Sequence, residues 1–292
     1  MKFKISAFST ALFSTWINVE ELNLLIDAGD GVSMGLLQKS RKVKHVFITH
    51  PDRDHLNGLP QFVQLNSRPD FPVIHYPKDS GSFPAMNQFL NKFDPHVKSS
   101  NWIGIEDDQI IQIKKGYEIH AIRNEHVKSP IGVHKSLSYK LFETKKKLKE
   151  EFKDFNTDQI KKIALNRGRD FLTETIKKNI ISFSGDTPVD NYEKWNNSEL
   201  LIHESTFLNT ESDSNIESRG NKHSTLIEVM QMVKEINVNT LILNHFSSRY
   251  SKEQIDKAVM KLINDFSLQI PVYLIYPGEI HRDILNSKPI NE

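Results

Sequence analysis

Short apolar runs alternate along the chain with segments in which apolar residues recur every three or four positions. The runs predict β-strands and the longer periodic segments predict amphipathic helices. The strands are predicted over 22–27, 43–49, 73–76, 110–113, 117–123, 137–142, 180–184, 200–203, 240–244 and 272–276, with a first strand pair within 5–17. The helices are predicted over 32–40, 59–66, 83–93, 225–236 and 252–266.

This order mixes hairpins with crossover helices, which periodicity alone assigns to the α/β or α+β class. A helix–sheet–sheet–helix sandwich fits it. We find no linker rich in Pro, Gly or Ser and no short-period repeat, so the expectation is one domain over 1–292 with an insertion at about 143–178.

The composition is that of an ordinary globular protein, with 38% hydrophobic and 26% charged residues and a net charge of +1. There is no cysteine, so disulfides are excluded and any metal ligand must be nitrogen or oxygen. The mildly apolar segment 5–17 is too short to span a bilayer and lacks a cleavage pattern, and a cytoplasmic location is the default expectation.

The insertion at 143–178 is rich in lysine and arginine, beginning with Lys145-Lys146-Lys147-Leu148-Lys149. One interpretation is a basic arm that binds a polyanionic substrate. The other is a solvated helical surface, because Glu150, Glu151, Asp154 and Asp158 are interspersed. The sequence leaves both open.

The most informative stretch is His50-Pro51-Asp52-Arg53-Asp54-His55, which follows an apolar run that reads as a buried strand. Four side chains able to bind a metal fall within six positions. Such a motif can also be a charged loop, but a position just past a buried strand is a poor place for an unpaired carboxylate. The stretch therefore predicts metal ligands.

The same ligand types follow other apolar runs, as His126, Asp186 and His245. A carboxylate at a strand end, such as Asp186 after Ser184-Gly185, can bridge two cations. Each residue also has a structural interpretation: a surface histidine, a helix N-cap and a core histidine, respectively. Their recurrence at strand ends favours a hydrolase site with two metal ions.

Two further segments have proton-transfer potential. Glu204 follows the strand Leu201-Ile202-His203, and His223 precedes a predicted helix. A histidine oriented by a carboxylate is suited to protonate a leaving oxygen. The structural alternatives are a capping motif and a buried polar pair.

Five segments resemble the metallo-β-lactamase superfamily and, within it, the ribonuclease Z (tRNase Z) branch of phosphodiesterases. They appear in order over most of the chain, and the last three are far more specific to this branch than the first. They are the stretch from Ile48 to Pro60, Ser184-Gly185-Asp186-Thr187, Leu201-Ile202-His203-Glu204-Ser205-Thr206-Phe207, Lys222-His223-Ser224-Thr225 and Asn244-His245-Phe246-Ser247-Ser248-Arg249-Tyr250.

The resemblance implies an αββα sandwich, two divalent metal ions and hydrolysis of phosphodiester bonds by a metal-activated hydroxide. It implies that His50, His126 and Asp186 hold one ion, and that Asp54, His55, Asp186 and His245 hold the other. It further implies that Asp54 orients the hydroxide and that His223, positioned by Glu204, is the general acid. It also implies a homodimer that acts on RNA, such as a tRNA precursor, as an endonuclease in tRNA processing.

Three departures from the family pattern bear on metal and substrate. Asp52 stands where the family has a histidine, so the expected zinc has manganese, iron and magnesium as alternatives. The family's early Gly-rich loop is replaced by Ser6-Ala7-Phe8-Ser9-Thr10, and no Gly-Pro-rich arm is recognisable in 143–178. Three hypotheses stay open: an RNA 3′-end endonuclease, a cyclic nucleotide phosphodiesterase of the same fold, and a catalytically impaired binding member.

Overall fold

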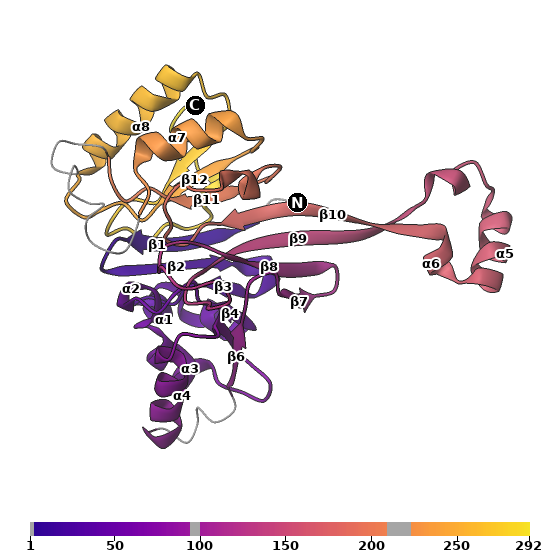
Figure 1. Ribbon diagram of the computed structural model, residues 1–292, viewed down its shortest axis with the longest axis horizontal. Helices are drawn as coiled ribbons and strands as arrows, with labels where there is room; N and C mark the ends of the chain where they lie inside the picture. Colours follow the sequence, from indigo (N-terminus) through magenta and orange to yellow (C-terminus); the bar gives the residue numbers. More distant parts are fainter. Residues whose placement is uncertain (1–2, 94–99, 209–222) are drawn as a thin grey trace.

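The chain folds into four layers, with two β-sheets packed face to face and helices on both outer faces (Figure 1). The computed structural model describes residues 3–93, 100–208 and 223–292. This architecture confirms the αββα sandwich of mixed α/β class expected from the sequence. Among the described residues, no helix is both long and apolar enough to cross a membrane.

The first sheet follows the order of the chain, and its strands β3 to β6 run parallel to one another. Crossover segments join the parallel strands, while β1, β2 and β3 form an antiparallel meander. Its described strands are β1 (Ile5–Thr10), β2 (Ser14–Val19), β3 (Leu24–Ile26), β4 (His45–Phe47), β5 (Val73–Pro77) and β6 (Asn101–Ile105).

The second sheet has the order β13-β12-β11-β10-β9-β8-β7 among the described residues. Its half from β10 to β13 is parallel and its half from β7 to β10 is antiparallel. Its strands are β7 (Ile110–Lys114), β8 (Tyr117–Arg123), β9 (Leu137–Leu148), β10 (Thr173–Phe183), β11 (Leu201–Glu204), β12 (Leu241–Asn244) and β13 (Val272–Leu274).

Among the described residues, three hydrophobic clusters fill the spaces between the four layers. The central cluster packs the sheets together through residues such as Ile17, Tyr139 and Phe183. A second covers the first sheet with the helices α1 (Val32–Leu36), α2 (Arg53–Leu56), α3 (Leu59–Asn66) and α4 (Ser82–Phe93). The third lies under α7 (Leu226–Glu235) and α8 (Lys252–Phe266). Burial of these apolar faces is the main stabilising contribution to the sandwich.

Most predicted elements are present, with differences that have local causes. Helices α3 and α8 have the predicted bounds, whereas the helix expected over 32–40 ends at Leu36 and continues as a 3-10 turn. Strand β6 was not predicted, because three of its five residues are exposed at the sheet edge and its hydrophobic alternation is weak. The segment 53–56 was expected as a loop and is the short helix α2.

Strands β9 and β10 extend beyond the second sheet as a long two-stranded arm (Figure 1). Pairing of β9 with β8 stops at Glu143, while pairing with β10 continues to Leu148, about 17 Å farther at 3.4 Å per residue. A small head follows, with η4 (Glu150–Phe152), α5 (Thr157–Arg167) and α6 (Arg169–Leu172). The lysine run at 145–147 therefore lies on an extended strand, and the helical surface interpretation is wrong for that run.

Candidate metal centre

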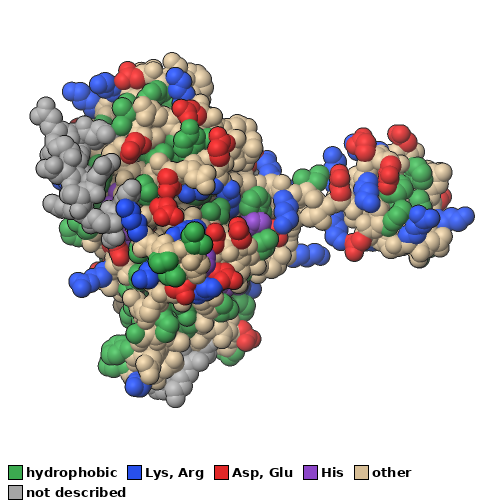
Figure 2. All heavy atoms as spheres, in the orientation of Figure 1, with side chains coloured by type: hydrophobic (Ala, Val, Ile, Leu, Met, Phe, Trp, Pro, Cys, Tyr) green, Lys and Arg blue, Asp and Glu red, His purple; other side chains and the backbone are tan. Residues whose placement is uncertain are grey.

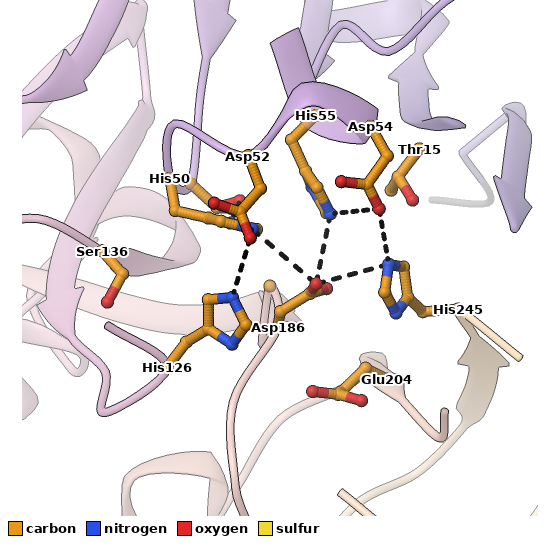
Figure 3. A network of polar contacts seen from close by, with 12 residues as sticks. Thr15, His50, Asp52, Asp54, His55, His126, Ser136, Asp186, Glu204 and His245 are labelled. Atoms are coloured by element: carbon orange, nitrogen blue, oxygen red, sulfur yellow. Dashed lines mark hydrogen bonds and ion pairs between the residues drawn. The ribbon is translucent and has the colours of Figure 1, made fainter. Parts of the chain in front are cut away.

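The predicted site residues come together where parallel strands of both sheets end (Figure 3). The segment 50–55 follows β4 of the first sheet, Asp186 follows β10, and His245 follows β12. Carboxyl ends of parallel strands lie at one edge of a sheet, so the two packed sheets bring their loops to a shared edge. This arrangement joins residues almost 200 positions apart in the sequence.

Four of these residues form a compact group, which we call the second donor cluster: Asp54, His55, Asp186 and His245. All four are buried. The Nε2 atoms of His55 and His245 both lie 3.3 Å from Asp186 Oδ2, and they lie 3.5 and 3.3 Å from Asp54 Oδ2. Two imidazoles and two carboxylates therefore face one point.

His50, Asp52 and His126 form an adjacent group, the first donor cluster. Asp52 Oδ2 lies 3.7 Å from His50 Nε2 and 3.5 Å from His126 Nε2. His50 Nε2 is also 3.7 Å from Asp186 Oδ2, so one carboxylate oxygen of Asp186 approaches both clusters. The Asp52 side chain is 43% exposed while both histidines are fully buried, so Asp52 closes the cluster on its solvent side.

The spacing of these atoms fits bound divalent cations. Nitrogen and oxygen ligands lie about 2.0–2.1 Å from zinc in tetrahedral sites, which places any two ligands about 3.3 Å apart. The separations in the second cluster are 3.3–3.5 Å and those in the first are 3.5–3.7 Å. Among the described residues, the buried Nε2 atoms of His50 and His55 have no hydrogen-bond partner. Buried polar atoms without a partner are costly unless a ligand satisfies them.

Buried hydrogen bonds aim the histidines at the centre. His55 Nδ1 donates to Asp27 Oδ2 at 2.8 Å, and His50 Nδ1 donates to the Thr49 hydroxyl at 2.9 Å, which itself donates to Asp27. His245 Nδ1 donates in the same way to Thr206, whose hydroxyl donates to Glu204. Partners of this kind fix the ring orientation and leave Nε2 to face the metal.

The sequence pattern did not single out Asp27, Thr49 or Thr206 as site residues. Asp27 carried a readable signal, since it ends the apolar run Leu24-Leu25-Ile26 as the other site residues end theirs. Thr49 and Thr206 carried none, because a threonine beside a histidine is common and its partner is visible only in three dimensions.

The turn that presents Asp186 depends on the preceding glycine. Gly185 has φ +59, and a Cβ atom there would lie 3.0 Å from the Thr49 methyl group. Only glycine adopts this conformation at such close approach without strain. Gly185 therefore allows the turn that brings the Asp186 carboxylate between the two clusters.

His223 and Glu204 lie beside the second donor cluster as a hydrogen-bonded pair. His223 Nδ1 donates to Glu204 Oε1 at 3.1 Å and is 3.8 Å from Asp186 Oδ2. Burial lowers the pKa of His223, but the Glu204 carboxylate outweighs burial, and the net effect raises this pKa to about 9. The imidazole is thus protonated near neutral pH, as a proton donor must be.

The surroundings of Asp186 and His50 favour the protonation states that bind metal, namely an ionised carboxylate and a neutral imidazole. Burial raises the pKa of Asp186, but His245 and His55 outweigh it and hold that pKa well below its usual range. Burial and the neighbouring His55 hold the pKa of His50 well below its usual value, so this imidazole is neutral. Burial opposes charge on His55 as well, but Asp186 and Asp27 raise its pKa well above the usual value, so its proton must leave when a metal binds.

A cavity of about 240 Å³ opens above the clusters. Asp54, Asp186, His223 and His245 form its polar floor, and its remaining wall includes Leu12 and Phe207. The site therefore has room for part of a substrate directly beside the donor atoms.

Known proteins are similar to this chain in sequence and in fold. Residues 12–134 match the family model of the metallo-beta-lactamase superfamily. The chain is 29% identical over 280 residues to the chloroplastic tRNase Z TRZ2 of Arabidopsis thaliana, covering 92% of this chain and 74% of the relative. It is 27% identical to a ribonuclease Z of Oceanobacillus iheyensis, with 84% and 88% covered. The human short-form tRNase Z structure superposes with a TM-score of 0.59 at 18% identity, covering 95% and 99% of the two chains.

The chain is thus similar to the metallo-β-lactamase superfamily over residues 12–134 and to ribonuclease Z proteins over most of its length. Its described residues include groups of histidine and aspartate able to hold divalent metal.

Proposed function

We propose that the chain is a phosphodiesterase with a binuclear metal centre that cleaves RNA as an endonuclease, in the manner of ribonuclease Z. The observation that carries the proposal is the pair of donor clusters sharing Asp186 Oδ2, with the His223–Glu204 pair beside them. A protein that only bound metal would need no buried proton donor next to its ligands.

In this proposal His50, Asp52, His126 and Asp186 hold one ion, and Asp54, His55, Asp186 and His245 hold the other. When bound, the ions supply hydroxide near neutral pH and neutralise negative charge on the phosphoryl group. Zinc is our first assignment. Asp52 adds a hard oxygen ligand to the first cluster, so manganese, iron or magnesium are the alternatives.

The chain's own side chains then complete the reaction. Asp54 accepts a hydrogen bond from Leu12 N–H at 3.0 Å and is held beside the attacking position, where its carboxylate orients the nucleophilic water. His223 donates its proton to the leaving oxygen as the P–O bond breaks, and Glu204 stabilises the imidazolium before that transfer. Water thus adds to phosphorus and the leaving group departs as an alcohol.

The arm supports RNA rather than a cyclic mononucleotide as substrate. The segment 143–178 carries eleven Lys and Arg against seven Asp and Glu, a net charge of +4 in a protein whose total is +1. A small cyclic substrate bound over the donor clusters would have no use for a basic extension that reaches far beyond the body (Figure 2). We further propose a tRNA precursor as substrate, a cytoplasmic location and a homodimer.

The substitution Asp186→Ala tests the metal assignment. We expect hydrolysis of bis(p-nitrophenyl) phosphate to fall by about 100-fold or more and both ions to be lost, because this side chain approaches both clusters. Elemental analysis would count the ions, and a melting curve would show whether the variant folds. Asp265→Ala, on the exposed face of α8, is the control. Full activity or unchanged metal content in Asp186→Ala would refute the assignment.

A further inference from the structure

The cavity over the donor clusters combines a charged floor with an apolar wall. Asp54, Asp186 and His223 line the floor, while Leu12 and Phe207 belong to the wall. Its volume of about 240 Å³ is below the range of about 300–1,000 Å³ that encloses a whole small ligand. It therefore suits one planar group attached to a phosphodiester.

Leu12 is the unusual member of this wall. It lies in the turn between β1 and β2 with φ +70 and a side chain that is 86% exposed. A positive φ raises the conformational free energy of a bulky residue, and an exposed leucine does not offset this cost by packing. Its N–H nevertheless holds Asp54 Oδ2 at 3.0 Å. Leu12 is thus hydrogen-bonded to Asp54, the residue that orients the nucleophile in the proposed function.

Phe207 lies on the side of the proton donor. Its ring is edge-on to the His223 ring with centroids 6.1 Å apart, and the Arg249 guanidinium lies 5.4 Å over it. A base attached to the scissile phosphate would reach this part of the wall, because Phe207 and His223 line the same cavity. Aromatic rings and stacked arginines are the surfaces on which unpaired nucleobases bind.

We propose that this cavity is a nucleoside subsite, in which Leu12 and Phe207 hold the base next to the scissile phosphate. The inference rests on the proposed phosphodiesterase function. A base held between these side chains cannot be paired, so the cleaved linkage must be single-stranded. Leu12 acts as a specificity-determining residue. Its backbone N–H binds Asp54, and this places its side chain where it contacts the base beside the nucleophile.

Leu12→Gly is the decisive variant. Glycine adopts positive φ without strain and keeps the N–H that binds Asp54, so only the apolar side chain is lost. Leu37→Gly is the matched control, because Leu37 is also an exposed leucine, with φ +49, and does not line the cavity. The two variants make the same chemical change at comparable positions.

Two esters with the same leaving group separate the subsite from the chemistry: thymidine 5′-(p-nitrophenyl phosphate) and methyl p-nitrophenyl phosphate. We expect Leu12→Gly to lower kcat/KM about tenfold more for the thymidine ester than for the methyl ester, mainly through KM. Leu37→Gly should change neither. Equal losses on both esters, or no loss on the thymidine ester, would overturn the subsite.

A binding measurement keeps the test independent of turnover. Calorimetry on the metal-loaded protein should show tighter binding of thymidine 5′-monophosphate than of methyl phosphate, and Leu12→Gly should remove most of the difference. If wild-type protein hydrolyses neither ester, the proposed function fails. If it hydrolyses both but binds the two phosphates equally, only the subsite fails.

Discussion

At the scale of single residues, the rings of His50, His55 and His245 each have a hydrogen-bond partner behind them. Asp27 serves two of them, by accepting from His55 directly and from Thr49, which in turn accepts from His50. Glu204 has the same double position, since it accepts from both His223 and Thr206. Two buried carboxylates therefore set the direction of four side chains.

The proton donor gives the sharpest prediction at this scale. In His223→Ala we expect RNA cleavage to fall by about 10²–10⁴-fold while both ions remain bound. Hydrolysis of bis(p-nitrophenyl) phosphate should fall much less, because p-nitrophenolate leaves without protonation. Steady-state rates with both substrates and elemental analysis would measure this.

The pH profile adds a second criterion for the same residue. Because the pKa of His223 is raised to about 9, the acid form is present below that pH and is lost above it. Wild-type RNA cleavage should therefore decline on the alkaline side, and His223→Ala should lack this decline. His120→Ala, a partly exposed histidine on β8, is the control. Loss of metal from His223→Ala would make His223 a ligand instead.

At the scale of elements, the arm is the part of the molecule that departs most from a compact sandwich. Several of its lysines are already paired, Lys145 with Glu143 and Lys146 with Asp170 among them. These are exposed pairs, which contribute little stability and exchange readily for other anions. In the proposed function, the arm presents this positive charge to RNA.

Charge reversal on the arm tests this role. We expect Lys145→Glu combined with Lys147→Glu to weaken RNA binding. The slope of log K against the logarithm of the salt concentration should become about 1–2 less steep. Turnover of bis(p-nitrophenyl) phosphate should not change, because the arm contains the start of β10, whereas Asp186 follows the end of β10. Lys257→Glu with Lys261→Glu on exposed positions of α8 makes the same charge change elsewhere. RNA binding that survives unaltered would favour the cyclic nucleotide hypothesis.

At the scale of the whole molecule, the metal centre joins the two halves of the sandwich. His50 and Asp54 follow β4 of the first sheet, with Asp54 on the short helix α2, whereas Asp186 and His245 follow strands of the second sheet. Without a cation, the site brings several carboxylates together, and the proton on His55 partly offsets their charge. Metal binding and the packing of the two sheets should therefore support one another.

This coupling predicts a metal-dependent melting temperature. Ions that bind only the folded chain should stabilise it by about 2.7 kcal/mol per site at a concentration 100 times Kd. The shift should be larger at pH 8 than at pH 6, because His55, whose pKa is raised, must lose its proton to bind metal. Thermal melts with and without a chelator at both pH values would measure it. If the chelator does not change the melting temperature, metal binding and the packing of the two sheets are not coupled.

The sequence determined much at the level of elements. Hydrophobic periodicity located α3 and α8 to the residue, since each buries a continuous apolar stripe. It failed at β6 and along the outer parts of β9 and β10, where strands are exposed and no buried face imposes alternation. Hydrophobic alternation along the sequence indicates which residues are buried. These strands form by pairing with a neighbouring strand rather than by burying one face, so the alternation is absent.

The chain by itself determined which residues can bind a metal, because ligand chemistry belongs to the side chain and strand ends are readable from apolar runs. Only the tertiary structure decided that Asp186 Oδ2 faces both clusters, that Asp52 completes the first and that Asp27 aims His55. These relations depend on the angle and spacing at which two sheets pack. That geometry is a property of the assembled core, and no segment of sequence contains it.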